Sequence, residues 1–165
     1  MNGCLAIMSI YNLVRKQHIN APLPEVWEFF SHPDNLRDLT PAYMNFKVTS
    51  QPYTGSIYAG QIITYTVAPI LGIPLAWMTE ITHVQPGRLF VDEQRHGPYK
   101  LWHHQHHFEP TDNGVLMTDI VHYQLPLRIL GDIAQSIFVA RQLNSIFDFR
   151  KNAIASRFFL NNDKH

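Results

Sequence analysis

Hydrophobic and polar residues alternate in several stretches before residue 126, and after it hydrophobic residues recur every three or four positions. A period of two is typical of strands that bury one face, and the longer period is typical of an amphipathic helix. The sequence TDNG at 111–114 predicts a hairpin turn. The predicted strands span residues 5–19, 44–52, 57–68, 75–84, 88–95, 97–110 and 115–126.

Two short helices are expected between the first two strands, in the stretch NAPLPEVWEFFSHPDNL. Asn20 is the expected cap of the first helix, and Pro33 ends it because proline cannot continue a helix. Asp34 is the expected cap of the second helix, which ends near residues 39–41. The first helix has an apolar face made of Val26, Trp27, Phe29 and Phe30.

A long helix is predicted from Leu130 to about Leu160. An antiparallel sheet needs one face covered, and a single helix covers it only when the sheet curls around that helix. The sequence therefore predicts an α+β fold in one domain over residues 1–165, with a core over about 9–160. With the short helices at one end, this arrangement leaves a cavity between the sheet and the long helix.

The composition favours a large apolar core or an apolar pocket. Hydrophobic residues make up 45% of the chain and charged residues 16%, which is below the roughly 25% that is usual in globular proteins. Lys plus Arg and Asp plus Glu number 13 each, so there is no basic excess to neutralise phosphates. We therefore expect no nucleic-acid partner.

Cysteine content and the N-terminal stretch favour a cytoplasmic protein. Cys4 is the single cysteine, which excludes an internal disulfide and a thiolate metal cluster. The first residues are apolar but lack the basic region and cleavage site of a secretion signal, and Met8 is an alternative start. No apolar run reaches the roughly 18 residues of a transmembrane helix, so we expect no stable membrane insertion.

Three motifs on the predicted strands carry a resemblance to a known superfamily. They are F-x-D-x-Q-x-x-G-P-Y at 90–99, W-x-H-x-H-x-F at 102–108 and M-x-D-x-V-x-Y-x-x-P at 117–126. Together with APLPEVWEFF and LNSIFDFR, they resemble the SRPBCC superfamily of START/Bet v 1-like helix-grip proteins, and most closely its ligand-binding, cell-division-inhibitor-like branch. The resemblance implies a curved antiparallel sheet wrapped around a long C-terminal helix. It also implies either binding of a hydrophobic ligand or cyclase activity on polyketides, and fold likeness alone does not choose between them.

Four histidines lie within five residues in YKLWHHQHHFEP, but alternation along a strand divides them between its two faces. His103 and His107 share a face with polar neighbours, so we expect them at the surface. The opposite face, expected to point inward, carries Trp102, His104, His106 and Phe108.

The same parity places an aspartate on the inner face of each neighbouring strand. Asp119 and Tyr123 share the more apolar face of their strand. Periodicity leaves the preceding strand ambiguous, and the resemblance favours the face with Phe90, Asp92 and Gln94 as the inner one. Polar groups from three adjacent strands are therefore expected to meet among aromatic residues.

This inward polar cluster has four interpretations. It forms a self-satisfied hydrogen-bond network, or it is the polar part of a ligand pocket, and the two are compatible. A metal site would use His104 and His106 with Asp119 as the third ligand. However, H-x-H lacks a clear fourth ligand here, so we expect no metal and no cofactor. Acid–base catalysis would use a histidine oriented by Asp119, with Tyr123 or Tyr65 as the acid.

We expect a binding protein for a small hydrophobic or amphipathic molecule, such as a lipid, an isoprenoid or a polyketide-like compound. One alternative is a cyclase/dehydratase-like enzyme that uses His104, His106, Asp119 and Tyr123. Another is a protein-interaction module with a vestigial cavity, whose partner would be another protein. Arg150 either reaches the cavity carboxylates or projects into water. The residues expected to form the binding site are Tyr65, Trp77, Phe90, Asp92, Gln94, Trp102, His104, His106, Phe108, Asp119, Tyr123, Ile146, Phe147 and Arg150.

Overall fold

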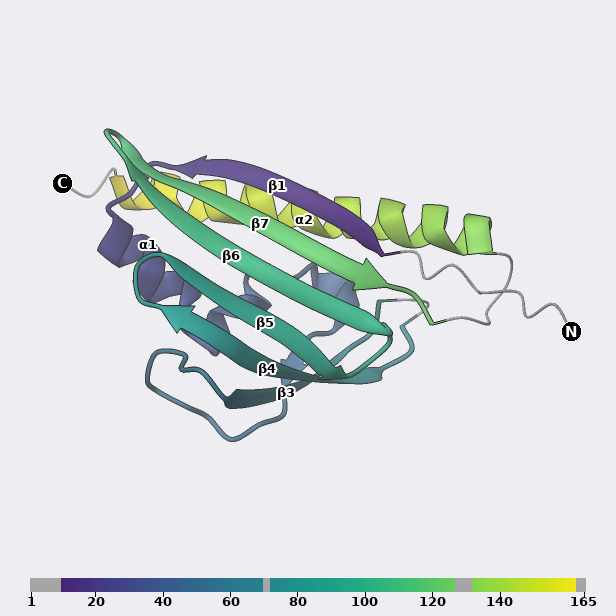
Figure 1. Cartoon of the computed structure of the whole chain (residues 1–165). Helices are drawn as coiled ribbons and strands as arrows, with labels where there is room; N and C mark the ends of the chain where they lie inside the picture. The colour runs from purple at the N-terminus through teal and green to yellow at the C-terminus, as the bar shows by residue number, and fades with distance from the viewer. Residues whose placement is uncertain (1–9, 70–71, 127–131, 163–165) are drawn as a thin grey trace, which may run out of the picture.

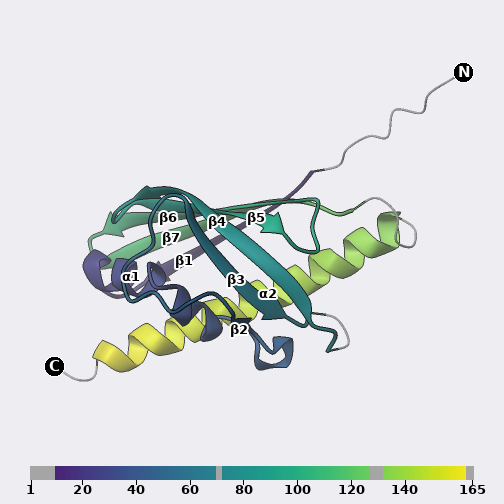
Figure 2. The same cartoon turned by 90° about the horizontal axis from the view of Figure 1, so that it is seen from below.

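The computed structural model describes residues 10–69, 72–126 and 132–162, within which seven strands form one antiparallel sheet. The sheet curves around the long helix α2 (Figure 1, Figure 2). In chain order the elements are β1 Tyr11–Ile19, α1 Leu23–Phe30, the 3-10 helices η1 Pro33–Arg37 and η2 Ala42–Met44, β2 Lys47–Val48, β3 Gln61–Val67, β4 Leu75–Gln85, β5 Leu89–His96, β6 Leu101–Thr111, β7 Gly114–Gln124 and α2 Asp132–Asn162.

The strand order in the sheet is β1-β7-β6-β5-β4-β3-β2, so only β1 pairs with a strand that is distant in the chain. Helix α2 lies across the concave face, and α1 lies at one end of the space between them (Figure 2). This arrangement confirms the predicted α+β helix-grip fold. The predicted positions of Cys4, Met8 and Leu130 lie outside the described residues. Among the described helices, none has the length and hydropathy needed to cross a lipid bilayer.

An irregularity in β4 helps the sheet to curve. The pairing of β4 with β5 shifts register between Ile81 and His83, which leaves Thr82 without a Cα partner. The extra residue changes which positions face inward, from Ile81 before it to Val84 after it. Such bulges bend a strand and increase its twist, which brings the sheet edge towards α2.

Helix starts and one strand differ from the sequence expectations. Asn20 does not cap α1, because Pro22 occupies the N-cap position without a side-chain hydrogen bond. His32, rather than Asp34, precedes η1. The strand expected at 44–52 is reduced to the two residues of β2. Its first part is instead the end of η2 followed by Asn45, whose backbone is left-handed with a φ of 46°.

Aromatic packing fills the end of the fold beneath α1. The ring of Trp27 meets Phe90 and Phe108 edge-on, with centroids 6.1 Å and 5.5 Å away. Phe29 makes a similar contact with Phe158 of α2 at 5.6 Å. Each such pair contributes about 0.5–1.5 kcal/mol beyond the burial of its area. This aromatic packing therefore borders the open space that lies further along the concave face.

Candidate functional site

A cavity of about 510 Å³ lies between the concave face of the sheet and α2. This volume is within the range of sites that hold small molecules. Its wall is mostly apolar and comes from the end of α1, η1, the η2 region, β3 to β6, the segment after β7, and α2. The lining residues that carry the argument below are Leu36, Met44, Phe46, Tyr65, Trp77, Thr79, Asp92, Tyr99, Trp102, His104, His106, Leu125, Ile146, Phe147 and Arg150.

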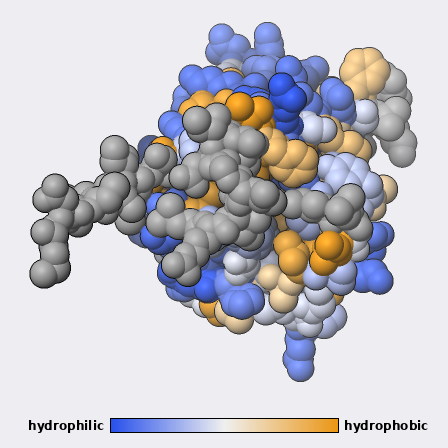
Figure 3. All heavy atoms as spheres, turned by 90° about the vertical axis from the view of Figure 1, so that its right-hand side faces the viewer, coloured by the Kyte–Doolittle hydropathy of each residue, from blue (hydrophilic) through white to orange (hydrophobic). Residues whose placement is uncertain are grey.

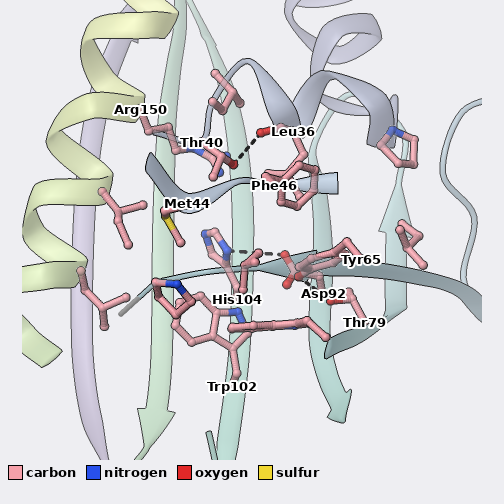
Figure 4. A pocket seen from close by; sticks show the side chains of 18 of the residues that line it. Leu36, Thr40, Met44, Phe46, Tyr65, Thr79, Asp92, Trp102, His104 and Arg150 are labelled. Carbon is pink, nitrogen blue, oxygen red and sulfur yellow. Dashed lines mark hydrogen bonds and ion pairs between the residues drawn. The ribbon is translucent and has the colours of Figure 1, made fainter. Parts of the chain in front are cut away.

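Aromatic rings form one side of this cavity (Figure 4). Tyr65 on β3 stacks on Trp77 on β4, with ring centroids 5.8 Å apart. Trp77 in turn meets Trp102 edge-on at 5.5 Å and Tyr99 at 5.6 Å. Flat rings on adjacent strands offer large contact areas with few rotatable bonds, which suits a flat or elongated apolar ligand.

Apolar residues also reach the surface at the end of the molecule where β7 ends and α2 begins (Figure 3). Leu125 and Pro126, which follow β7, line the cavity, as does Val139 near the start of α2. Phe138, beside Val139, has 52% of its surface exposed. The cavity lining therefore extends to this end, away from the aromatic packing under α1.

A polar cluster interrupts the apolar wall at the middle of the sheet. Asp92 on β5 is the register partner of His104 on β6, and His106 is the partner of Asp119 on β7. Arg150 reaches the cluster from α2 (Figure 4). The strand pairing thus brings the four groups together, because each lies on the inward face of its strand.

Each histidine lies between the two aspartates. His104 Nε2 is 2.9 Å from Asp119 Oδ1, and its Nδ1 is 3.5 Å from Asp92 Oδ2. His106 Nε2 is 2.8 Å from Asp92 Oδ2, and its Nδ1 is 3.0 Å from Asp119 Oδ1. The two imidazole rings are in contact, with centroids 3.8 Å apart. Arg150 Nη2 completes the cluster, 3.6 Å from Asp119 Oδ1 and 3.3 Å from His106 Nδ1.

These neighbours decide which groups carry charge. Burial opposes ionisation of Asp119, but Arg150 and the two histidines outweigh it and hold the pKa of this carboxyl well below its usual value. Burial likewise opposes ionisation of Asp92, whose pKa is nevertheless lowered by His104, by the hydrogen bond from His106 and by Arg150. Burial, with His106 beside it, lowers the pKa of His104. Both aspartates are therefore carboxylates at neutral pH, and His104 favours its neutral form.

Two buried N–H groups of the cavity wall have no hydrogen-bond partner among the described residues: Trp77 Nε1 and Arg150 Nε. Only 7% of the surface of Arg150 is exposed, so bulk water does not take the place of a partner. Buried donors are nearly always paired, and leaving one unpaired costs about 1–3 kcal/mol. Both groups are suited to donate to an acceptor atom of a molecule in the cavity.

The remaining two histidines of the cluster HHQHH lie on the opposite, outer face of β6. His103 Nδ1 is 3.1 Å from Glu93 Oε1, and His107 Nε2 is 2.9 Å from Gln105 Oε1. Both side chains are partly exposed. The predicted division of the four histidines between two faces is therefore what the structure shows.

Four residues expected in the binding site are not among those that line the cavity. Gln94 holds the β5–β6 turn, where its side chain bonds the backbone of Tyr99 at 2.6 Å and 3.2 Å. Phe108 lies in the aromatic packing under α1. Asp119 lies behind the two histidines, and Tyr123 packs against Val139 and Leu143 of α2. Inward parity identifies the buried face, but it does not tell which part of that face another element covers.

The other ten predicted residues line the cavity. Sequence reasoning missed the wall that the region before β3 provides, including Leu36, Met44 and Phe46. Met44, Phe46 and Val48 alternate along the chain, and this was the available signal. Tyr99 was also missed, although it belongs to the quoted motif at 90–99.

A family model described as polyketide cyclase / dehydrase and lipid transport matches residues 19–147. A search of curated proteins finds no match.

Solved structures with a similar fold cover almost the whole chain. The Zhui aromatase/cyclase of a Streptomyces species aligns with a TM-score of 0.70 at 13% identity, over 90% of this chain and 93% of that one. The major latex-like protein 151 of Panax ginseng aligns with a TM-score of 0.65 at 13% identity, over 90% and 97% of the two chains. A protein from Thermus thermophilus gives a TM-score of 0.66 at 13% identity, over 92% and 99%. Likeness at this level of identity shows the fold alone.

Proposed function

Because the chain belongs to the polyketide cyclase/dehydrase and lipid transport family, we propose that it binds a small, largely apolar molecule carrying a hydrogen-bond acceptor. The observation that carries this proposal is the cavity of about 510 Å³, whose wall combines stacked aromatic rings with two unpaired N–H donors. An acceptor oxygen on the ligand would pair a donor that is otherwise buried without a partner. The aromatic side favours flat, polyketide-like or isoprenoid ligands.

The size of the cavity argues against an interaction module with a vestigial interior, since such a module would have its interior filled by side chains. An enzyme of the cyclase/dehydratase type remains the second candidate. It is supported by Asp92, His104 and His106, which bring proton donors and acceptors to the wall itself. Tyr123, which we expected to act as the acid, does not line the cavity, whereas Tyr65 does.

Native mass spectrometry of the protein purified from its own organism tests the binding proposal. We expect the wild-type protein to retain one small molecule. Ile146→Trp places an indole in the cavity and should abolish retention, whereas Phe149→Trp, at a position that is 40% exposed on the same helix, should leave it unchanged. Equal retention by both variants would mean that the molecule binds elsewhere.

Fluorescence provides a second test that does not need a co-purified ligand. Trp77 and Trp102 line the cavity, so palmitate and the flavonoid quercetin should change the emission saturably in the wild type and not in Ile146→Trp. If neither probe changes the emission and no compound co-purifies, the binding proposal is wrong.

Comparison of His104→Ala with Asp119→Asn separates a carrier from an enzyme. In a carrier, the variants weaken retention of the co-purified compound and no product forms in the wild type. In an enzyme, the wild type converts the compound, and the variants retain it without converting it.

A further inference from the structure

Three atoms of the kinds that bind metal ions converge on one point of the cavity wall. Asp92 Oδ2 lies 2.8 Å from His106 Nε2 and 3.5 Å from His104 Nδ1. One ligand atom from each of the three residues lies within 4.8 Å of the other two, and all three residues line the cavity. Ligands held about 2.1 Å from a metal ion are separated by roughly 3.0–3.4 Å. The two separations from Asp92 Oδ2, 2.8 Å and 3.5 Å, are therefore close to those of a coordinated set.

The nitrogens on the far side of both imidazole rings lie close to one carboxylate oxygen. His104 Nε2 and His106 Nδ1 lie 2.9 Å and 3.0 Å from the same oxygen, Asp119 Oδ1. Histidines that bind metals nearly always donate their other N–H to a carboxylate, a carbonyl or water, which fixes the ring orientation. Asp119 is placed to do this for both rings, and it does not itself line the cavity.

The charges of the cluster also accommodate a cation. Asp92 and Asp119 contribute two negative charges, and Arg150, 3.6 Å from Asp119 Oδ1, contributes one positive charge. Arg150 thus balances the carboxylate behind the rings, and the negative charge of Asp92 remains at the cavity wall. The triad offers two imidazole nitrogens and one carboxylate oxygen, a set that suits divalent first-row transition metals better than Mg²⁺ or Ca²⁺.

The hydrogen bonds can rearrange to admit an ion without loss of a proton from the cluster. In the tautomer of His106 that carries its proton on Nε2, Nε2–H donates to Asp92 and Nδ1 accepts from Arg150 Nη2 at 3.3 Å. When Nε2 binds an ion, its proton moves to Nδ1 of the same ring, where Asp119 accepts it. In the tautomer that carries its proton on Nε2, His104 donates to Asp119 and leaves Nδ1 for the ion.

From this geometry we propose that Asp92, His104 and His106 bind one divalent transition-metal ion, with Asp119 orienting both rings. From the sequence, Asp119 was the candidate third ligand, whereas in the structure we assign that role to Asp92. Three protein ligands leave coordination positions open, as in sites where a water or substrate oxygen completes the set. Because all three residues line the cavity, an acceptor oxygen of a molecule bound there would reach the ion. The proposal is independent of the proposed ligand binding and goes beyond it.

Metal loading of the chelator-treated full chain tests the proposal. Zn²⁺ is added, excess is removed by gel filtration, and retained metal is measured by mass spectrometry, with Co²⁺ absorption reporting the coordination. We expect about one equivalent in the wild type. Asp92→Asn should retain none, and Asp119→Asn should bind roughly 10–100-fold more weakly.

The matched control addresses the outer face of the same strand, which also carries histidines. The double variant His103→Gln/His107→Gln should retain the full equivalent of Zn²⁺. If this variant loses the metal, or if Asp92→Asn keeps it, the proposal is wrong.

A measurement on the unaltered chain covers the case in which Asp92→Asn does not fold. In ¹⁵N-histidine spectra, Zn²⁺ should shift the ring nitrogens of two of the ten histidines. These two signals must be distinct from those that His103→Gln and His107→Gln remove. No shift, or a shift of the outer pair alone, overturns the proposal. Quercetin titration of the same samples reports ligand binding separately, so failure of one property is distinguished from failure of the other.

Discussion

Arg150 is the residue on which the polar cluster depends most. It is buried on α2 between two aromatic rings, with its guanidinium carbon 5.5 Å from the ring centre of Phe30 and 5.9 Å from that of Phe147. It is also the one arginine or lysine that the described ion pairs place next to Asp119. A buried carboxylate without a cation is costly, so this arginine contributes more than a surface ion pair would.

Replacement of Arg150 by methionine should lower the free energy of unfolding by about 3–5 kcal/mol, because it leaves Asp119 buried without its positive partner. Urea unfolding followed by circular dichroism measures this. Arg157→Met is the matched control on the same helix. Arg157 also lies over a phenylalanine, Phe29 at 5.0 Å, but its side chain is exposed, and its loss should cost no more than about 1 kcal/mol. Similar losses for the two variants would contradict this role of Arg150.

For the individual residues of the polar cluster, the sequence predicted part of the arrangement. The inward position of His104, His106 and Asp119 followed from strand parity, since each strand keeps a period of two through that point. The position of Arg150 was left open, because a helix register gives the face of a residue but not the length of gap that its side chain must cross. The carboxylate nearer the cavity could not be chosen either, since parity treats Asp92 and Asp119 alike.

The β6–β7 hairpin depends both on its own turn sequence and on close packing against β1. Thr111 pairs with Gly114, so Asp112 and Asn113 form the loop. Gly114 has a φ of 140°, and a Cβ there would lie 2.1 Å from the backbone oxygen of Ile19 on β1. The glycine is thus needed for the close approach of β1 as well as for its own backbone conformation.

Replacement of Gly114 by alanine should lower the midpoint of urea unfolding, because the β1 backbone must move to admit a methyl group. Gly60→Ala is the control: φ there is 90°, but no atom lies within 4 Å of the added Cβ. That control should lose only the cost of the left-handed backbone, roughly 1–2 kcal/mol. Gly114→Ala should lose at least about 2 kcal/mol more. Equal losses would show that β1 gives way easily.

Element order and fold class followed from the sequence, and the family match confirms the predicted superfamily. The predicted boundaries of elements were wrong where tertiary packing outweighed the local sequence pattern. The strand expected at 44–52 reads as alternating, yet the chain turns at Asn45 and places Met44 and Phe46 against the cavity instead of extending the sheet. The bulge at Thr82 could not be predicted from the alternation of apolar and polar residues, because Ile81 and Val84 are both apolar although they lie at positions of opposite parity.

On the scale of the whole molecule, the cavity divides the interior into a packed end and an open part. The packed end, with Phe108 and Met117 almost fully buried, supplies stability that does not depend on a ligand. The open part contains unpaired donors and apolar surface that a ligand would cover. A bound molecule should therefore stabilise the native state without being required for folding.

Removal of the co-purified molecule with a hydrophobic resin should lower Tm. A ligand present at about 100 times its Kd stabilises by roughly 2.7 kcal/mol, which corresponds to about 5–11 °C for a domain of this size. Differential scanning calorimetry measures the shift, and the organic extract of the untreated protein should restore it. The variant Ile146→Trp should show no shift with either treatment. An unchanged Tm in the wild type would contradict a ligand held in the cavity.

The two outermost strands also determine how the molecule behaves among copies of itself. β2 offers only two residues, too few to act as a template for another chain. β1 is longer, but α2 runs alongside it, tied by Arg15 to Asn144 and by Gln17 to the backbone of Lys151 at 2.9 Å. An open sheet with a hollow interior would otherwise be prone to strand-to-strand aggregation. With one edge strand short and the other bridged to the helix, we expect strand-to-strand pairing between copies to be disfavoured whether or not the cavity is occupied.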